Sequence, residues 1–281
     1  MSLIVFLLII FSAFFHASWN FAAKKASGNF YVVYLSLLIA SVLFFPFLFT
    51  LSVSELFNVR AFPYVFATGT IHAVYFFALA KAYEHGDISS AYPIARGTGV
   101  AGTALAATLF LNEAITMFGL FGIVSISIGT LLVGLKNSNQ TGGLKGLLFA
   151  LLVGTMIVGY SIVDKLGVGI MNPVAYIFGL WIFATLWLTP YVLIFKRREL
   201  SLAWKEYKKY SFIIGIGSLM TYLLILFIYR IAQVSYVVAL RELAVAIGAV
   251  LGFVFLGEKP TGLKIIGITL IVLGMMAIKL A

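Results

Sequence analysis

The chain has 281 residues, of which 63% are hydrophobic and only 10% are charged, and its mean hydropathy is +1.12. Because about a quarter of the residues in a typical soluble domain are charged, this composition excludes an ordinary soluble protein. The net charge of +10 does not indicate a nucleic-acid partner, since the lysines and arginines mostly flank apolar runs, as they do in membrane proteins. The absence of cysteine excludes a disulfide framework and a thiolate metal site.

Apolar runs of about 20 residues are typical of membrane-spanning helices. In chain order, the sequence predicts ten of them, at residues 2–23, 30–51, 61–83, 88–111, 117–135, 144–164, 172–195, 210–232, 234–256 and 261–280. No stretch shows the apolar–polar alternation of membrane β-barrel strands. The longest connection, 196–209, is too short for an extramembrane domain. The predicted fold is an all-α integral membrane protein whose function lies among its helices.

The second half of the chain repeats features of the first. Each half has an arginine 17 residues before a glutamate, namely Arg96 and Glu113, then Arg241 and Glu258. At similar offsets the last helices share two glycines, Gly122 and Gly129 against Gly267 and Gly274, and the opening "WNFAAK" corresponds to "YSIVDK". We therefore predict two five-helix repeats, 1–136 and 144–281. Because five is odd, the second repeat enters the membrane inverted, as in transporters that alternate access around a midplane site.

These repeats resemble the EamA family of the drug/metabolite transporter superfamily. In the first half a helix of small residues precedes "LNEAIT" and the glycine-punctuated "GLFGIVSISIGTLLVG", and in the second half "LGEKPT" and "GLKIIGITLIVLGMM" take the same places. The resemblance covers essentially the whole chain, including the opening "HASWN". It implies a basket-like carrier of small metabolites, with a central cavity lined by the first, third, fourth, sixth, eighth and ninth helices.

Arg96 and Arg241 lie about two turns inside their predicted helices. A charge at that depth is costly unless it faces protein, water or a partner. One interpretation is an internal ion pair, for example of Arg241 with Glu242 or Asp164. The other is a bidentate grip on a substrate's carboxylate or phosphate, which suits the planar guanidinium. The sequence leaves both interpretations open.

Further polar and aromatic residues within the predicted helices are candidates for the walls of the cavity. Polar groups surrounded by lipid need partners, and aromatic faces with hydroxyls suit an apolar or aromatic ligand. Hydrogen bonding between helices is an equal alternative for the polar residues of the first helix. The candidates are His16, Trp19, Asn20, His72, Tyr75, Tyr92, Tyr160 and Tyr222.

Acidic residues are rare inside the predicted helices. Glu242 and Asp164 are the candidates there for an ion pair or a proton relay. Glu113 and Glu258 come just before the last helix of each half, where we expect them to act as N-terminal caps or first-turn acids.

The function that these features favour is a secondary-active carrier with alternating access, for a small anionic or zwitterionic metabolite such as an amino acid. The alternatives are a carrier of a phosphorylated or phosphonate compound and a drug or metabolite exporter. The sequence lacks HExxH, GxSxG and a pair of intramembrane aspartates, which disfavours an intramembrane enzyme. It also lacks a repeated filter motif, which disfavours a channel. We expect a multi-pass monomer in a prokaryotic inner membrane, without a cofactor or metal. Its expected partners are the bilayer and a small-molecule substrate, and proton coupling is a hypothesis.

The distribution of basic residues predicts the orientation of the chain. Connections after odd-numbered helices carry most lysines and arginines, whereas the other side has Arg60, Lys165, Arg230 and Lys279. Since basic connections stay in the cytoplasm, residues 196–209 should be cytoplasmic and both termini external. A reporter that is active only in the cytoplasm, fused after Ala281, should therefore be inactive. Its activity would show the opposite orientation.

Overall fold

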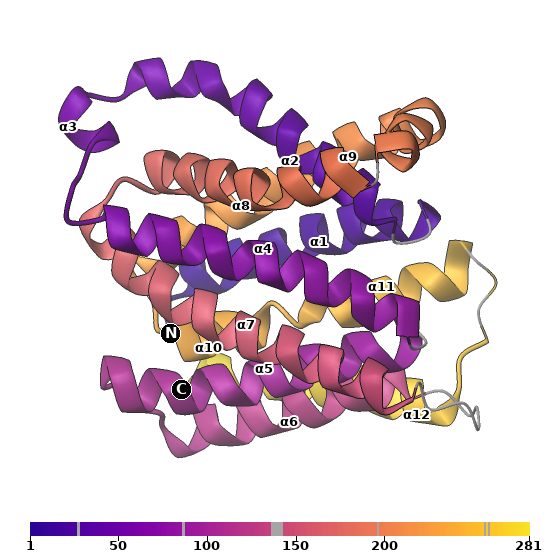
Figure 1. Cartoon of the computed structure of the whole chain (residues 1–281). Coiled ribbons are helices and arrows are strands. Elements are labelled where there is room, and N and C mark those ends of the chain that lie inside the picture. The colour runs from indigo at the N-terminus through magenta and orange to yellow at the C-terminus, as the bar shows by residue number, and fades with distance from the viewer. Residues whose placement is uncertain (27–28, 86–87, 136–142, 196, 256, 258) are drawn as a thin grey trace.

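The computed structural model describes every residue except 27–28, 86–87, 136–142, 196, 256 and 258 (Figure 1). The described residues form helices and no strands. The helices are α1 (Leu3–Lys25), α2 (Phe30–Phe44), η1 (Phe45–Thr50), α3 (Val53–Leu56), α4 (Phe62–His85), α5 (Ile88–Leu111), α6 (Met117–Gly134), α7 (Leu144–Ile170), α8 (Pro173–Phe195), α9 (Arg197–Tyr229), α10 (Val234–Leu240), α11 (Leu243–Phe255) and α12 (Gly262–Leu280). Ten segments of this described chain are long and apolar enough to cross a membrane, with α10 and α11 together making one, which confirms the ten predicted spans.

Three spans depart from the predicted helix boundaries. The second changes at Phe45 from α-helix to the tighter 3₁₀ helix η1, whose first turn holds Pro46, a residue that cannot donate a backbone hydrogen bond. The expected connection at 196–209 is largely helical, because α9 begins at Arg197 and bends at Tyr207. The ninth span is interrupted at Arg241 and Glu242.

The two halves meet most extensively where α6 packs against α12. A Cβ added to Gly129 would lie 2.6 Å from the backbone oxygen of Gly267, and one added to Gly122 would lie 2.6 Å from that of Gly274. In the repeat, Gly122 corresponds to Gly267 and Gly129 to Gly274, so each helix presents the same two positions to the other. Such reciprocal contacts between antiparallel helices are what a two-fold axis produces. The contacts fit the inverted-repeat arrangement.

The remaining helices of the two halves also interleave. Helix α4 of the first repeat packs against α7 and α8 of the second, and α9 of the second repeat packs against α1 and α2 of the first. The two chain ends lie at the same end of the bundle, where Lys279 Nζ donates to the backbone oxygen of Met1 at 3.0 Å (Figure 1). The central space is therefore enclosed by both repeats.

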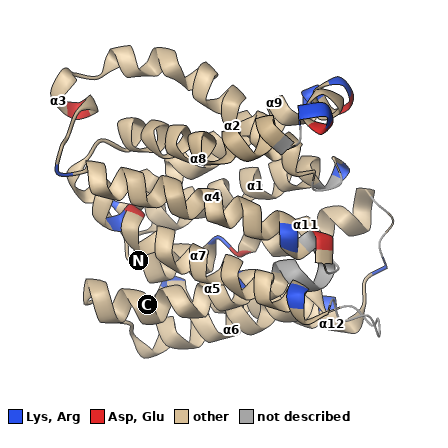
Figure 2. Cartoon of the chain, in the orientation of Figure 1, with Lys and Arg blue, Asp and Glu red and all other residues tan. Residues whose placement is uncertain are grey.

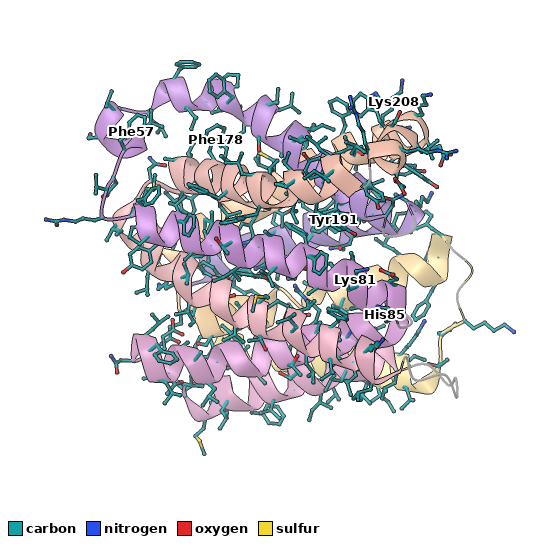
Figure 3. The ribbon with its side chains drawn as sticks, in the orientation of Figure 1. Phe57, Lys81, His85, Phe178, Tyr191 and Lys208 are labelled. Carbon is teal, nitrogen blue, oxygen red and sulfur yellow. The ribbon has the colours of Figure 1, made fainter. Side chains whose placement is uncertain are left out.

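The surface has the distribution of polarity that a bilayer requires. Large apolar side chains such as Leu109, Phe118 and Phe121 are exposed on the flanks of the bundle, because lipid takes the place of a protein core around them. Basic side chains gather at the end where α9 begins, and few lie at the end that holds the chain termini (Figure 2). Lys208 and His85 lie toward the basic end and Phe57 lies at the opposite end (Figure 3).

The glycine contacts between α6 and α12 predict which small substitutions destabilise the fold. Gly129→Ala would press a methyl group against the backbone of α12, so we expect a loss of about 1–3 kcal/mol, typical of overpacking, seen as a lower melting temperature in detergent. The matched control is Gly248→Ala on α11, because a Cβ there meets nothing within 4 Å. Equal melting temperatures for the two variants would contradict the tight contact.

Candidate functional site

A cavity of about 140 Å³ lies between the two repeats. Since a water molecule takes about 30 Å³ of liquid, this is room for a small ligand rather than for a macromolecule. Side chains of the helices that the family resemblance implied do line it, together with residues of α2 and α8 such as Phe30 and Trp181. The cavity reaches Ala23 near the end of α1 and Ala80 near the end of α4, so it extends from the centre toward the basic end of the bundle.

Most of the candidate substrate-binding residues line this one cavity. They are His16, Trp19, Asn20, His72, Tyr75, Arg96, Tyr160, Tyr222 and Arg241. The side chain of Tyr92 lies outside the described residues. Glu242 and Asp164 are buried beside the cavity and do not line it.

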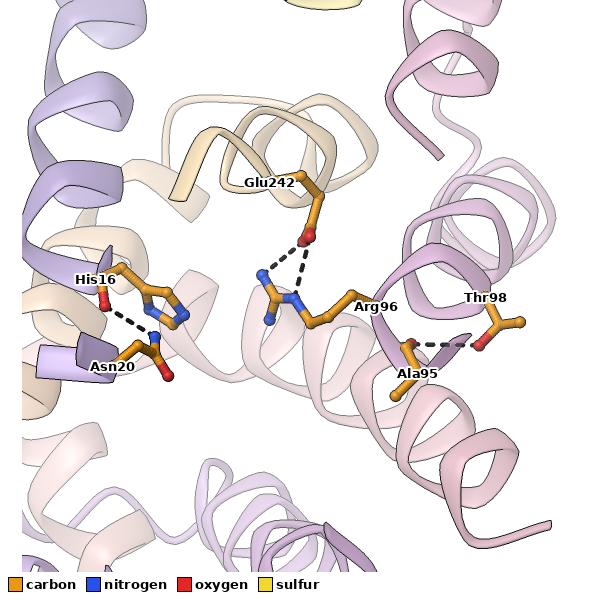
Figure 4. A network of polar contacts seen from close by, with 6 residues as sticks. All are labelled: His16, Asn20, Ala95, Arg96, Thr98 and Glu242. Carbon is orange, nitrogen blue, oxygen red and sulfur yellow. Dashed lines mark hydrogen bonds and ion pairs between the residues drawn. The ribbon is translucent and has the colours of Figure 1, made fainter. Parts of the chain in front are cut away.

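Arg96 forms an ion pair with Glu242 (Figure 4). Its Nη2 lies 2.5 Å from Oε1 and its Nε donates to Oε2 at 3.2 Å, and the side chains are 6% and 1% exposed. The pair connects α5 of the first repeat with the interrupted helix of the second. The sequence-based interpretation gave Arg241 with Glu242 or Asp164 as its example of an internal ion pair, whereas in the structure Glu242 pairs with Arg96 of α5.

Arg241 and Glu242 are the two residues at which the ninth span is interrupted. Between α10 and α11, the N–H of Glu242 donates to the oxygen of Ala239 at 3.0 Å, and that of Val245 donates to the oxygen of Glu242 at 2.8 Å. These bonds span three residues and tighten the backbone relative to an α-helix. The equivalent helix, α5, runs unbroken past Arg96. Interrupted helices at the centre of a bundle are a common way to build a binding site in transporters.

Of the two matched arginines, Arg241 has no ion-pair partner among the described residues. Its side chain is 5% exposed, and among the described residues its Nε has no hydrogen-bond partner. Its guanidinium carbon lies 5.5 Å from the centre of the Tyr222 ring, a cation–π contact that stabilises the charge without neutralising it. The cavity wall therefore carries one compensated guanidinium and one uncompensated guanidinium.

Aromatic rings form another part of the cavity wall, beside Arg241. His72 stacks on Tyr160 with ring centres 4.4 Å apart and meets the edges of Tyr222 at 5.4 Å and Trp181 at 5.9 Å. The indole nitrogens of Trp19 and Trp181 are buried without an acceptor in the described part of the chain. An indole N–H can only donate, so both groups need an acceptor that the described residues do not supply.

The sequence predicted the cavity-lining residues of α1 but not Trp181 of α8. On α1, His16 contacts the edge of Trp19 at 4.8 Å, and the Asn20 amide donates to the His16 oxygen at 2.8 Å. Figure 4 shows this face opposite Arg96. Sequence reasoning did not identify Trp181, because an aromatic residue in an apolar helix has no local signal that separates a cavity wall from a lipid contact.

Glu113 is a helix cap, as predicted, but of a different helix. Its carboxylate accepts from the N–H groups of Val234 at 2.6 Å and Ser235 at 3.1 Å, so it caps α10 of the other repeat. Thr116 caps α6 in its place, and its own N–H donates to the Tyr236 hydroxyl at 3.1 Å. Glu258 lies outside the described residues. These contacts join the two repeats at the end of the bundle away from the cavity mouth.

No metal site is formed by the residues that the structure describes. The chain matches the EamA-like transporter family over residues 3–135 and 144–280. A solved structure described as "Crystal structure of protein" matches with a TM-score of 0.77 and 16% identity, over 100% of this chain and 98% of that one. At this identity the likeness shows the fold alone. No curated protein matches the sequence.

The different surroundings of the two arginines predict opposite effects of removing them. Arg96→Met leaves Glu242 buried without its cation, which typically costs about 3–5 kcal/mol, so the melting temperature should fall. Arg241→Met removes an uncompensated charge, so the melting temperature should stay or rise. The double variant Arg96→Met/Glu242→Met should recover most of the lost stability. A fall of the same size in both single variants would be the contrary result.

Proposed function

Because the chain belongs to the EamA-like transporter family, we propose that this multi-pass integral membrane protein is a secondary-active carrier. The proposed substrate is a small metabolite with one carboxylate, anionic or zwitterionic, and the proposed site is the cavity between the repeats. The observation that carries this proposal is the unpaired Arg241 on the cavity wall.

Charge balance supports a monoanionic group at this position. Arg96 is neutralised by Glu242, which leaves the positive charge of Arg241 for a ligand. A planar guanidinium binds a carboxylate with two parallel hydrogen bonds. The indole donors of Trp19 and Trp181 supply further bonds to acceptor oxygens after small side-chain movements, because both nitrogens are covered in this conformation. A phosphate carries more negative charge than Arg241 alone balances, so a phosphorylated compound is the weaker candidate.

The aromatic wall supports an apolar or aromatic body on the same substrate. The rings of His72, Tyr160, Trp181 and Tyr222 lie against one another, and stacking and edge contacts are what such rings offer a ligand. An amino acid with an apolar or aromatic side chain combines this body with a carboxylate. It is therefore the first class to test.

The inverted arrangement suggests how the site changes sides. At one end of the bundle the Glu113 cap on α10 holds the two repeats together, whereas the cavity reaches toward the other end. A rocking motion about the α6–α12 contact would exchange the closed and open ends. If the basic end is cytoplasmic, as the charge distribution predicts, this conformation is open to the inside of a prokaryotic cell. We propose that a monomer carries out this cycle.

A ligand screen tests the substrate class. Purified protein is heated with L-phenylalanine, L-leucine, phenylacetate, inorganic phosphate or a sugar phosphate, and a binder raises the melting temperature increasingly with its concentration. Flux of the binder is then measured in sealed vesicles, where a carrier saturates, a channel does not, and an enzyme converts the compound without moving it. Stabilisation by phosphates alone would overturn the carboxylate proposal.

Arg241→Lys separates recognition from charge. Lysine keeps the positive charge but loses the planar fork, so we expect binding of the carboxylate found in the screen to weaken roughly ten- to a hundred-fold, for a charge-assisted bond of about 1.5–3 kcal/mol. The melting temperature without ligand should remain close to that of the native protein. The control is Arg230→Lys at an exposed position. Native affinity in Arg241→Lys would exclude Arg241 from the site.

A further inference from the structure

A second buried carboxyl group, that of Asp164 on α7, lies one side chain away from the cavity. It is 0% exposed. The hydroxyl of Tyr176 on α8 donates to its Oδ1 at 2.9 Å, and the hydroxyl of Tyr222 on α9 donates to its Oδ2. All three side chains belong to the second repeat, and the contacts of the carboxyl group with them are neutral hydrogen bonds.

No cation among the described residues forms an ion pair with Asp164. The adjacent Lys165 turns away and donates to the backbone oxygens of Tyr229 and Ala232 at the end of α9. Arg241 lies over the ring of Tyr222, whose hydroxyl binds the carboxyl group, and forms no ion pair with Asp164. This differs from Glu242, whose carboxylate contacts Arg96 at 2.5 Å.

The other titratable groups around Asp164 do not supply a positive charge by contact. On α4, His72 lies against the Tyr222 ring, and its Nδ1 is within hydrogen-bond distance of the hydroxyl and the backbone oxygen of Thr68, at 3.1 and 2.9 Å. On α9, the hydroxyl of Tyr229 is buried without a partner in the described part of the chain. A buried carboxylate without a counter-ion is costly, and such a group commonly stays protonated instead. A neutral Asp164 needs an acceptor for its own O–H, and the hydroxyl of Thr68, which also hydrogen-bonds this carboxyl group, can accept that proton. With this acceptor and no cation in contact, the geometry favours a neutral Asp164 in this conformation.

Tyr222 connects this carboxyl group to the cavity. Its hydroxyl binds Asp164, its ring lies beneath the guanidinium of Arg241, and it lines the cavity. Any negative charge that appears on Asp164 is therefore close to the guanidinium that has no acidic partner. Asp164 and an anion in the cavity would compete for the same positive charge.

We propose that Asp164 is the proton-binding site of this carrier and that its proton travels together with the anionic substrate. The proposal rests on the proposed function, in which Arg241 holds the substrate's carboxylate. With Asp164 protonated, Arg241 is available to the anion. When the proton leaves to water, the Asp164 carboxylate attracts Arg241, and the anion is released.

Charge balance explains why the proton and the anionic substrate move together. For a monoanionic substrate without an ammonium group, such as phenylacetate, the loaded centre contains Arg241 with the substrate's carboxylate and a neutral Asp164, and the empty centre contains Arg241 with the Asp164 carboxylate. Arg96 and Glu242 compensate each other in both states. Each state has no net charge at the centre of the membrane, where a net charge is expensive. A state holding the anion without the proton would not be balanced.

Infrared spectroscopy of the ligand-free protein tests the proton site directly. The native protein at neutral pH should show a protonated-carboxyl band that disappears in Asp164→Asn and persists in the exposed control Glu206→Gln. Tyr176→Phe removes one hydrogen bond from the group, so it should shift the band to higher frequency even if Asp164→Asn folds poorly. A spectrum with no such band, or a band that neither variant changes, would overturn the proposal.

Transport in vesicles tests the coupling. With phenylacetate as the first probe, or the anionic binder found in the screen, the native protein should accumulate probe when a pH gradient is imposed and should carry protons with it. Asp164→Asn imitates the protonated group, so it should still exchange probe for probe while losing proton flux and gradient-driven accumulation. Proton-coupled accumulation by Asp164→Asn would refute the site. Failure of every probe to bind native protein would count against the proposed function, and the infrared result would still decide the proton site.

Discussion

The positive charge of a guanidinium buried among membrane helices must be balanced by a negative charge or a polar partner. The arrangement at the centre of this protein follows from how the charges of Arg96 and Arg241 are balanced. Arg96 is balanced by Glu242 on the other repeat, and the pair joins the two halves across the cavity. Glu242, which faces α5, and Arg241, which lines the cavity, both lie where the ninth span is interrupted between α10 and α11. The ion pair, the helix interruption and the unpaired Arg241 are thus parts of one arrangement.

The duplicated halves are symmetric at the contact between α6 and α12 and asymmetric around the cavity. At the α6–α12 contact, glycines of the two repeats meet reciprocally, and the same backbone approach occurs twice. At the centre, the position equivalent to Glu242 is Gly97, where even a Cβ would lie 2.8 Å from Leu131. The first repeat has no room there for an acidic side chain. Among the described residues the Glu242 carboxylate forms an ion pair with Arg96 alone, so the positive charge of Arg241 remains for a ligand.

At the end of the bundle away from the cavity mouth, the carboxylate of Glu113 joins the two repeats. Glu113 satisfies N–H groups at the beginning of α10, where the helix dipole favours negative charge. It belongs to one repeat and the helix it caps belongs to the other, so the rocking motion that we propose would break this contact when that end opens. A hydrogen-bonded cap of this kind can be broken and remade without leaving a charge in lipid, because it lies near the end of a span.

The sequence alone determined the ten spans, the duplication and the depth of the arginines, because a bilayer requires long apolar segments and makes buried charges conspicuous. It also indicated many of the polar and aromatic residues that line the cavity, such as His72 and Tyr160, since polar and aromatic groups within spans avoid lipid. Only the tertiary structure decided which carboxylate faces which arginine, that Trp181 joins the wall, and that Glu113 caps α10. These outcomes depend on contacts between helices far apart in the chain and on a local backbone interruption, neither of which leaves a periodic signal in the sequence.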